Sequence, residues 1–420
     1  MDPLNMSSAS IENEQLLRDS IDTESNTAEE HELIEVESDK PSSSSSTQPI
    51  QVADTPTTHY KPLVSPQVTS YSKAVAICLV MYGHILVYRW WGLPVWLAPL
   101  FRVSTLSVGV FAFLSGYGLT KSIQKSGTDG FFSKRFTTIY IPFFVTTVCF
   151  TCLFRGSYQS LDNFTILLKY LSLYLDLAST IDGTMWFITF ICSWYIIFYF
   201  VFRFIKNDHL RVIIITLIAI FAYYRFSQNT KYWRLWLVYS NQLFNIPLGV
   251  FFATYENNKY IQKFIKEKKI NIPIMLVQTA LIVILYWKVL YIGIQDYGTP
   301  HSNRFNTAQT VSNMLFGTWI PFLFTLYFNR SNVILDFLGG LSYEAYLLEG
   351  ILIEMKYSKT RVEDGVLYFL ITFACAYALK RVNQAAIQFT ISTVSTISQK
   401  IAGILQRQSY HPLRFGTNRE

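Results

Sequence analysis

KAVAICLVMYGHILVYRW, residues 73–90, is an apolar run with a cation at or near each end and one histidine, His84, inside it. A helix of this length crosses the hydrocarbon core of a bilayer. Similar apolar runs recur along the chain, near residues 98–120, 136–154, 186–205, 212–224, 240–255, 271–293, 309–328, 333–355 and 365–381. The sequence therefore predicts an all-α, polytopic membrane protein with about ten transmembrane helices.

Composition supports this fold class. Hydrophobic residues make up 51% of the 420 residues and charged residues only 15%, whereas a soluble domain carries about 25% charged residues. The stretch 164–180 is interrupted by Lys169 and Asp176, so we interpret it as interfacial or re-entrant rather than as a further span.

The distribution of charge predicts the orientation in the membrane. Residues 1–70 hold 13 acidic and 3 basic residues, a net charge of −10, whereas the whole chain is +7, so residues 71–420 carry +17. An even number of spans places most loop cations on one side: Lys73, Lys121, Lys125, Lys134, Arg135, Arg203, Lys206, Arg211, Lys259, Lys263, Lys266, Lys268, Lys269, Lys380 and Arg381. By the positive-inside rule both termini are cytosolic, and the charge reflects topology rather than nucleic-acid binding. Asn163 would then be open to glycosylation and Asn329 would not.

The chain divides into three segments. Residues 1–70 are a disordered, acidic, serine-rich cytosolic tail, residues 71–381 the transmembrane domain, and residues 382–420 an amphipathic C-terminal tail on the inner membrane surface. Two parts of the first tail fit the acidic dileucine pattern: Glu12 with Leu16-Leu17, and Glu29 with Leu33-Ile34. They predict a sorting adaptor as a partner and a eukaryotic endomembrane or vacuole as the location, with chance matches and the plasma membrane as the alternatives.

The five cysteines predict no disulfide framework, because all of them fall in apolar runs: Cys78, Cys149, Cys152, Cys192 and Cys375. Cys149 and Cys152 form a CxxC pair, but packing is a better explanation than metal or redox chemistry in the middle of a hydrophobic run. We predict no metal site.

His84 is the first functional candidate. A lone histidine in a membrane helix is costly to bury, which favours a functional role over a purely structural hydrogen bond. Lys73 precedes it by eleven residues, about three helical turns, so both side chains share one helix face ~16 Å apart. Lys73 at the cytosolic edge would hold the phosphates of a charged thioester while its reactive end reaches His84; the alternative is simple positive-inside flanking.

Five segments occur in a recognisable order over residues 71–381. They are Lys73–His84 (KAVAICLVMYGH), Val108–Leu119 (VGVFAFLSGYGL), Phe131–Pro142 (FFSKRFTTIYIP), Gly183–Ile188 (GTMWFI) and Leu338–Glu349 (LGGLSYEAYLLE). Together they resemble the acyltransferase-3 family of membrane O-acyltransferases, which has a basic residue, ten residues and a histidine in its first helix.

The resemblance implies transfer of an acyl group, commonly acetyl, from a cytosolic acyl-CoA to a hydroxyl of a carbohydrate or lipid-linked acceptor. It makes His84 the general base or acyl relay. It places Lys73, Lys134 and Arg135 at the acyl-CoA, with Lys73 in place of an arginine and Thr138 in place of a second loop arginine. Glu349 stands where the family often has a histidine, as a compensating acid or a sign of altered chemistry.

The chemistry also needs hydrogen-bond donors for the developing oxyanion. The matching segments offer Ser115, Tyr117, Ser342, Tyr343 and Tyr346, for each of which packing or helix capping is the alternative. Ser342, Tyr346 and Glu349 are spaced by four and three residues, so they share one helix face. Glu349 is the second functional candidate, to orient His84 or the acceptor, unless it reaches to the outer membrane edge. Trp186 and Trp90-Trp91 are substrate platforms or interface residues.

Two other functions stay open. A multi-pass transporter or flippase would use His84 and Glu349 as a proton or substrate path, although the sequence shows no inverted repeat with broken helices. A catalytically degenerate family member with a scaffolding role would explain Thr138 and Glu349.

Overall fold

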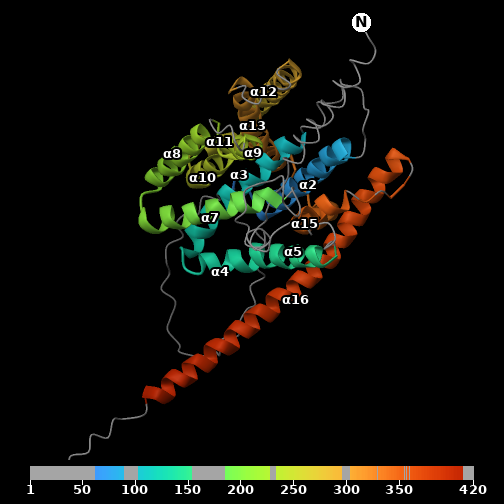
Figure 1. The fold of residues 1–420 in the computed structure, drawn as a ribbon. Helices are drawn as coiled ribbons and strands as arrows, with labels where there is room; N and C mark the ends of the chain where they lie inside the picture. The colour runs from blue at the N-terminus through green and yellow to red at the C-terminus, as the bar shows by residue number, and fades with distance from the viewer. Residues whose placement is uncertain are drawn as a thin grey trace, which may run out of the picture.

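A computed structural model describes residues 62–88, 103–153, 185–227, 233–295, 303–328, 330–353, 355, 357–358 and 360–409. This part of the chain is helical and contains no strand, which confirms the all-α prediction (Figure 1). The predicted N-terminal tail up to residue 61, the stretch 164–180, Trp90-Trp91, Asn163 and Asn329 lie outside the described residues.

The helices follow the predicted apolar runs. Their bounds are α2 (Pro66–Tyr88), α3 (Val103–Ser126), α4 (Phe131–Arg135), the π-helix η2 (Phe136–Tyr140), α5 (Ile141–Leu153), α7 (Trp186–Phe204), α8 (Asp208–Ser227), α9 (Trp233–Gln242), α10 (Asn245–Tyr255), α11 (Lys259–Lys266), α12 (Lys268–Gln295), α13 (Asn303–Tyr327), α14 (Val333–Gly339), α15 (Ser342–Leu352) and α16 (Arg361–Ser409). Within the described residues, five are long and apolar enough to cross a membrane: α3, α7, α8, the first part of α12 and the first part of α16.

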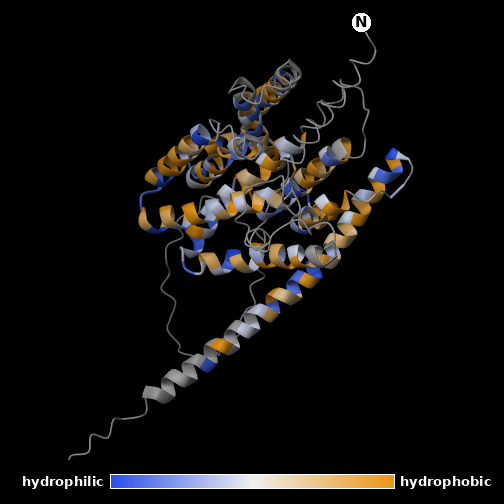
Figure 2. Ribbon diagram, in the orientation of Figure 1, coloured by the Kyte–Doolittle hydropathy of each residue, from blue (hydrophilic) through white to orange (hydrophobic). Residues whose placement is uncertain are grey.

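The outer helices expose extensive apolar surface, which is unfavourable in contact with water. Most residues of α8 and of the apolar part of α12 face outward, and the exposed side chains include Leu217, Phe221 and Leu276. Figure 2 shows α8 as a largely hydrophobic ribbon on the outside of the bundle. Continuous apolar surface of this kind fits lipid rather than water as the surrounding solvent, so the chain is a membrane protein.

Two predicted spans are not single helices. The run 240–255 is divided between α9 and α10 by a turn at residues 243–244, and the run 333–355 between α14 and α15 by a turn at residues 340–341. The break between α9 and α10 follows three polar residues, Ser240, Asn241 and Gln242. The break between α14 and α15 contains the pair Gly339-Gly340. Apolar content alone does not reveal such breaks, because a broken helix is as hydrophobic as a straight one.

The predicted amphipathic C-terminal tail begins within a helix. The prediction placed this tail at residues 382–420, and in the structure α16 runs without a break from Arg361 to Ser409. No glycine or proline occurs between residues 366 and 402 to end the helix that starts in the last apolar run. Figure 1 shows its far end extending beyond the other helices.

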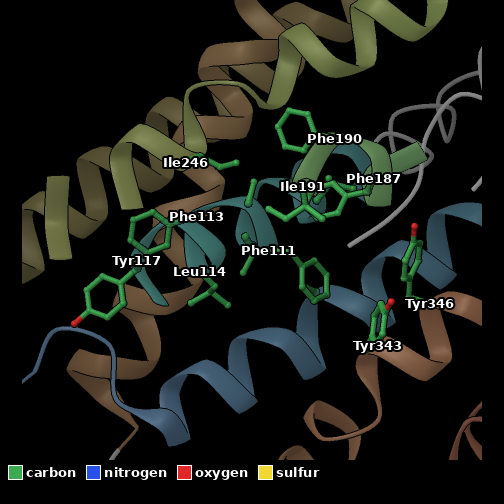
Figure 3. Close-up of a cluster of buried hydrophobic side chains, with 14 of the residues drawn as sticks. Phe111, Phe113, Leu114, Tyr117, Phe187, Phe190, Ile191, Ile246, Tyr343 and Tyr346 are labelled. Atoms are coloured by element: carbon green, nitrogen blue, oxygen red, sulfur yellow. The ribbon is translucent and has the colours of Figure 1, made fainter. Parts of the chain in front are cut away.

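Helix α3 is the central helix of the bundle. Its residues from Ser104 to Tyr117 are all buried, and it packs on α2, α10 and α13. Two glycines allow the backbones of α3 and α10 to approach closely: a Cβ on Gly116 would lie 2.3 Å from the carbonyl oxygen of Ile246, and a Cβ on Gly249 2.2 Å from that of Phe113. Figure 3 shows Phe113 and Ile246 among the buried hydrophobic side chains of this region. Small residues commonly allow such close packing between membrane helices.

We expect Gly249→Ala to destabilise the protein by about 2 kcal/mol, because the added methyl group collides with backbone atoms that cannot rotate away. The measurement is the midpoint of thermal unfolding of the purified protein in detergent. Ser126→Ala, at an exposed position on α3, is the control and should leave the midpoint unchanged. An unchanged midpoint for Gly249→Ala would contradict the packing of α3 on α10.

Candidate functional site

The structure brings the two strongest sequence candidates into direct contact. His84 lies near the end of α2 and Glu349 near the end of α15, and His84 Nδ1 is 2.8 Å from Glu349 Oε2. Only 2% of His84 and none of Glu349 is exposed. A carboxylate and an imidazole in a core of this kind are stable only because each is paired with the other.

A third residue, Tyr368 of α16, completes the cluster and was missed by the sequence reasoning. Its hydroxyl donates to Glu349 Oε2 at 3.2 Å and lies 3.4 Å from the backbone oxygen of Glu349. Tyr368 is fully buried. No spacing in the sequence connects it to His84; the only signal was a hydroxyl in the final apolar run.

His84, Glu349 and Tyr368 form a buried, hydrogen-bonded group of titratable side chains, called the His–Glu–Tyr cluster below. An ionised carboxylate can only accept a hydrogen bond, so beside it His84 Nδ1 carries the shared proton and Nε2 is the other ring nitrogen. When Nε2 takes a proton, the adjacent carboxylate stabilises the imidazolium. Tyr368 holds the same carboxylate oxygen and restricts the Glu349 side chain.

Lys73 and His84 lie on one helix, as the sequence predicted. Both residues lie on α2, and Lys73 is partly buried. Eleven residues of helix separate them by ~16 Å along the axis, on one face. His84 is also 18 residues from the start of α2 at Pro66, about 27 Å, so the His–Glu–Tyr cluster lies at the far end of the helix from its predicted cytosolic start.

The two cations of the basic loop, Lys134 and Arg135, are at least partly buried, although a phosphate site open to solvent was expected there. Arg135 is 4% exposed, and its guanidinium carbon lies 4.8 Å from the ring centroid of Phe131 and 6.0 Å from that of Tyr195. Lys134 beside it is partly buried. A guanidinium placed near two aromatic rings is held by cation–π attraction.

A π-helix follows this loop. Thr138, at the position where the family resemblance expects a second arginine, lies in η2, and its hydroxyl donates to the carbonyl oxygen of Lys134 at 2.7 Å. Tyr343 of α15 donates to the carbonyl oxygen of Ile139 at 2.7 Å. Short π-helices often occur at functional sites. Helix α15 therefore contacts η2 through Tyr343 and His84 through Glu349.

Tyr117 lies away from His84. Its hydroxyl donates to the buried carboxylate of Glu256, which also pairs with Lys121. The Tyr117 hydroxyl also accepts a hydrogen bond from the backbone N–H of Val64 at 3.3 Å. Val64 precedes α2, so this contact lies at the opposite end of α2 from His84, and Ser115, two residues before Tyr117, shares that region of α3. Tyr117 therefore contacts Glu256 and Val64 rather than His84, and Ser115 is buried on the same helix.

The remaining candidates have structural partners. Ser342 donates to the carbonyl oxygen of Gly339 at 2.6 Å at the start of α15. The ring of Tyr346 lies 6.1 Å from that of Tyr343, and Figure 3 shows the two tyrosines side by side on one helix. Trp186 is 3% exposed and packs against Tyr239, with ring centroids 5.5 Å apart, so it is a core residue rather than part of an interface belt.

Within the described residues, no group of three or more His, Cys, Asp or Glu side chains is arranged to hold a metal ion. Cys149 is exposed on α5.

We expect Tyr368→Phe to reduce the turnover of the site about tenfold, because Glu349 loses the donor that restrains its carboxylate. The measurement is the rate, under saturating donor, of the acyl transfer that the sequence resemblance implies. Tyr357→Phe is the matched control, since it removes a hydroxyl that donates to the carbonyl oxygen of Leu352 in the same region and should leave the rate within twofold. Equal losses in both variants would contradict a specific role for Tyr368.

The apolar helices surround the buried His–Glu–Tyr cluster, and together they define a helical membrane protein with paired titratable side chains in its core. A model of the acyltransferase-3 family, described as an acyltransferase domain, matches residues 70–381, and the chain belongs to this family. A search of curated proteins and a search of solved structures each found no match.

Proposed function

We propose that the protein is a membrane O-acyltransferase that moves an acyl group, acetyl in the first instance, from acyl-CoA to a hydroxyl of a carbohydrate or lipid-linked acceptor. The observation that supports this most directly is the buried contact between His84 and Glu349 at 2.8 Å. It supplies a general base that is oriented and electrostatically supported by a carboxylate, as transfer to an alcohol requires. Family membership supports acyl transfer as the reaction class.

The proposed reaction proceeds by proton transfer and one displacement. His84 Nε2 takes the acceptor hydroxyl proton as the hydroxyl oxygen attacks the thioester carbonyl carbon. The carbonyl becomes a tetrahedral oxyanion, which collapses with cleavage of the carbon–sulfur bond. The CoA thiolate leaves and takes the proton from the imidazolium, so His84 returns to its starting state. Glu349 stabilises the imidazolium between these two steps.

The donor would bind through cations at the other end of α2. Lys73, Lys134 and Arg135 are proposed to hold the phosphates of acyl-CoA. Lys73 offers a point charge rather than the two-pronged guanidinium of an arginine, and Thr138 adds a hydroxyl and no charge. We therefore propose a site whose donor affinity depends mainly on Arg135, with an endomembrane or the vacuole as the location.

One observation favours a transporter as the second candidate. The breaks between α9 and α10 and between α14 and α15 resemble the discontinuous helices that form binding sites in many transporters. In that function the His–Glu–Tyr cluster would carry a proton rather than activate a hydroxyl.

Incubation of radiolabelled acetyl-CoA with membranes containing the protein separates the candidates. Protein-dependent incorporation of label into glycan or glycolipid supports the acyltransferase. Flux of label or solute across sealed vesicles without covalent incorporation supports the transporter. The absence of both would support a family member without catalytic activity and would exclude our proposal.

A further inference from the structure

A second buried polar region lies around the break between α9 and α10 and plays no part in the reaction described above. Helix α13 contributes polar side chains at a spacing of three, four and seven residues, which places them on one face: Asn306, Gln309, Thr310 and Asn313. The end of α9 and the start of α10 contribute Ser240, Asn241, Gln242 and Asn245. None of the eight is more than 4% exposed. We call this group the amide cluster.

Part of the amide cluster closes the helix break. Asn313 Nδ2 donates to the carbonyl oxygen of Asn241 at 3.2 Å, which satisfies a backbone group that the break leaves open. Other bonds join side chains to one another: Ser240 to Asn306 at 3.2 Å, and Thr310 to the side chain of Asn241 at 3.2 Å. The amide cluster therefore contains more polar groups than the broken backbone requires.

Four polar atoms around the amide cluster are buried and have no hydrogen-bond partner among the described residues. They are Thr105 Oγ1, Trp186 Nε1, Asn245 Oδ1 and Gln309 Oε1, and they come from four different helices. Two of them are carbonyl oxygens that accept, one is an N–H that donates, and one is a hydroxyl that does both. Buried polar groups are normally satisfied, and lipid acyl chains supply neither donors nor acceptors.

The chemistry of the surroundings selects a neutral ligand rich in hydroxyls. All eight side chains of the amide cluster are uncharged, so it does not match the phosphates of acyl-CoA. The ring of Tyr239, next to Ser240 on α9, lies 5.5 Å from the ring of Trp186 and 5.6 Å from that of Phe190. A few placed polar groups beside aromatic side chains are typical of small-molecule binding sites, and hydroxyl groups both donate to amide oxygens and accept from an indole N–H.

The amide cluster and the His–Glu–Tyr cluster reach the same end of the bundle. Thr325, near the end of α13, donates to the backbone oxygen of Leu63, just before α2, so these two helix ends are adjacent. Asn306 precedes Thr325 by 19 residues on α13, which is about 29 Å of helix. His84 follows Pro66 by 18 residues on α2, which is about 27 Å of helix. The two residues therefore lie at similar distances from the adjacent helix ends. Helices α2 and α13 also contact one another.

From these observations we propose that the amide cluster, with Trp186 and Thr105, binds the acceptor as a neutral polyhydroxylated group such as a glycan. The proposal rests on the acyltransferase function and specifies where that function takes its second substrate. Gln309 and Trp186 act as acceptor-binding residues, and the donor does not touch them.

The test uses octyl β-D-glucoside, below its micelle concentration, as the probe with the full-length protein in lipid nanodiscs. Direct binding is measured with radiolabelled glucoside, and acyl transfer to it from labelled acetyl-CoA in parallel. Two variants are compared with the wild type: Gln309→Leu, and Trp186→Phe, which removes the indole N–H together with one ring of the indole and keeps one aromatic ring. Gln278→Leu is the matched control, because Gln278 is a buried amide of α12 whose two bonds go to Leu315 and Thr318.

We expect both variants to weaken glucoside binding about tenfold, which corresponds to about 1.4 kcal/mol, and to leave the KM for acetyl-CoA unchanged, whereas Gln278→Leu leaves both unchanged. Binding by the wild type without any transfer would reject the acyltransferase function and keep the binding site. Absence of saturable binding by the wild type, equal binding of octanol, or equal weakening by Gln278→Leu would each overturn the proposed site.

Discussion

Replacement of His84 by alanine should reduce protein-dependent acyl transfer about 10³-fold, with little change in the KM for acyl-CoA. General acid–base catalysis by a positioned side chain contributes about 10²–10⁴ to a rate, and His84 is the imidazole that the structure pairs with a buried carboxylate. The donor phosphates are expected near Lys73, ~16 Å away along α2, so donor binding should survive. The measurement is the initial rate of incorporation of labelled acetyl at several donor concentrations.

His209→Ala provides the matched control for loss of an imidazole. His209 is exposed on α8 and stacks on Tyr255, with ring centroids 5.4 Å apart. We expect wild-type transfer from this variant. Retention of transfer within fivefold of wild type in His84→Ala, in a protein that is folded by its elution profile and thermal midpoint, would exclude His84 as the base.

Glu349→Gln should reduce the transfer rate about 10²-fold, the second largest effect that we expect. The glutamine side chain has nearly the same shape and still accepts a hydrogen bond from His84 Nδ1, so the ring orientation is kept. The negative charge that stabilises the imidazolium is lost, and the protonated intermediate becomes less stable in a buried site. The loss should therefore appear in kcat rather than in KM, measured in the same incorporation assay.

The control for this variant is Glu344→Gln. Glu344 is also a buried carboxylate of α15, but it lies five residues earlier, about 140° around the helix from Glu349, and so faces away from His84. We expect a much smaller loss from it. A loss in Glu344→Gln as large as in Glu349→Gln would show that any buried charge on α15 matters and would remove the special role of the pair.

The pairing bears on the proposal that the chain has lost activity. The resemblance places a histidine where this chain has Glu349. From the sequence alone, the glutamate could replace the function of that histidine or could reflect a loss of catalytic activity. In the fold, that glutamate contacts His84 directly and accepts a hydrogen bond from Tyr368. A carboxylate beside an imidazole is a usual arrangement for a base, so compensation is the better explanation.

The structure also changes the expectation for the donor. An arginine that binds phosphate from the cytosol was expected in the basic loop, but Arg135 lies against Phe131 and Tyr195. Its exposure depends on which helices pack over the loop, and nothing in residues 131–142 themselves indicates it. Donor binding near Arg135 would therefore use the aromatic wall as well as the charge.

The amino-acid sequence by itself determined the membrane environment, the helical fold class and the positions of the long apolar helices. These features depend on hydrophobicity and length within single segments, which are local properties of the chain. It also indicated His84 and Glu349 separately, because an ionisable group within an apolar run is costly wherever the helix lies.

Only the tertiary structure decided which of these groups meet. His84 and Glu349 are 265 residues apart in sequence, and Tyr368 contacts Glu349 from a third helix. Tyr117 instead bonds to Glu256, at the other end of α2. The stripe of Asn306, Gln309, Thr310 and Asn313 was visible in the sequence at helical spacing, but its partners on α9 and α10 were not. Contacts between helices depend on how side chains interlock across packed surfaces, and that information is distributed over the whole chain rather than held in any one segment.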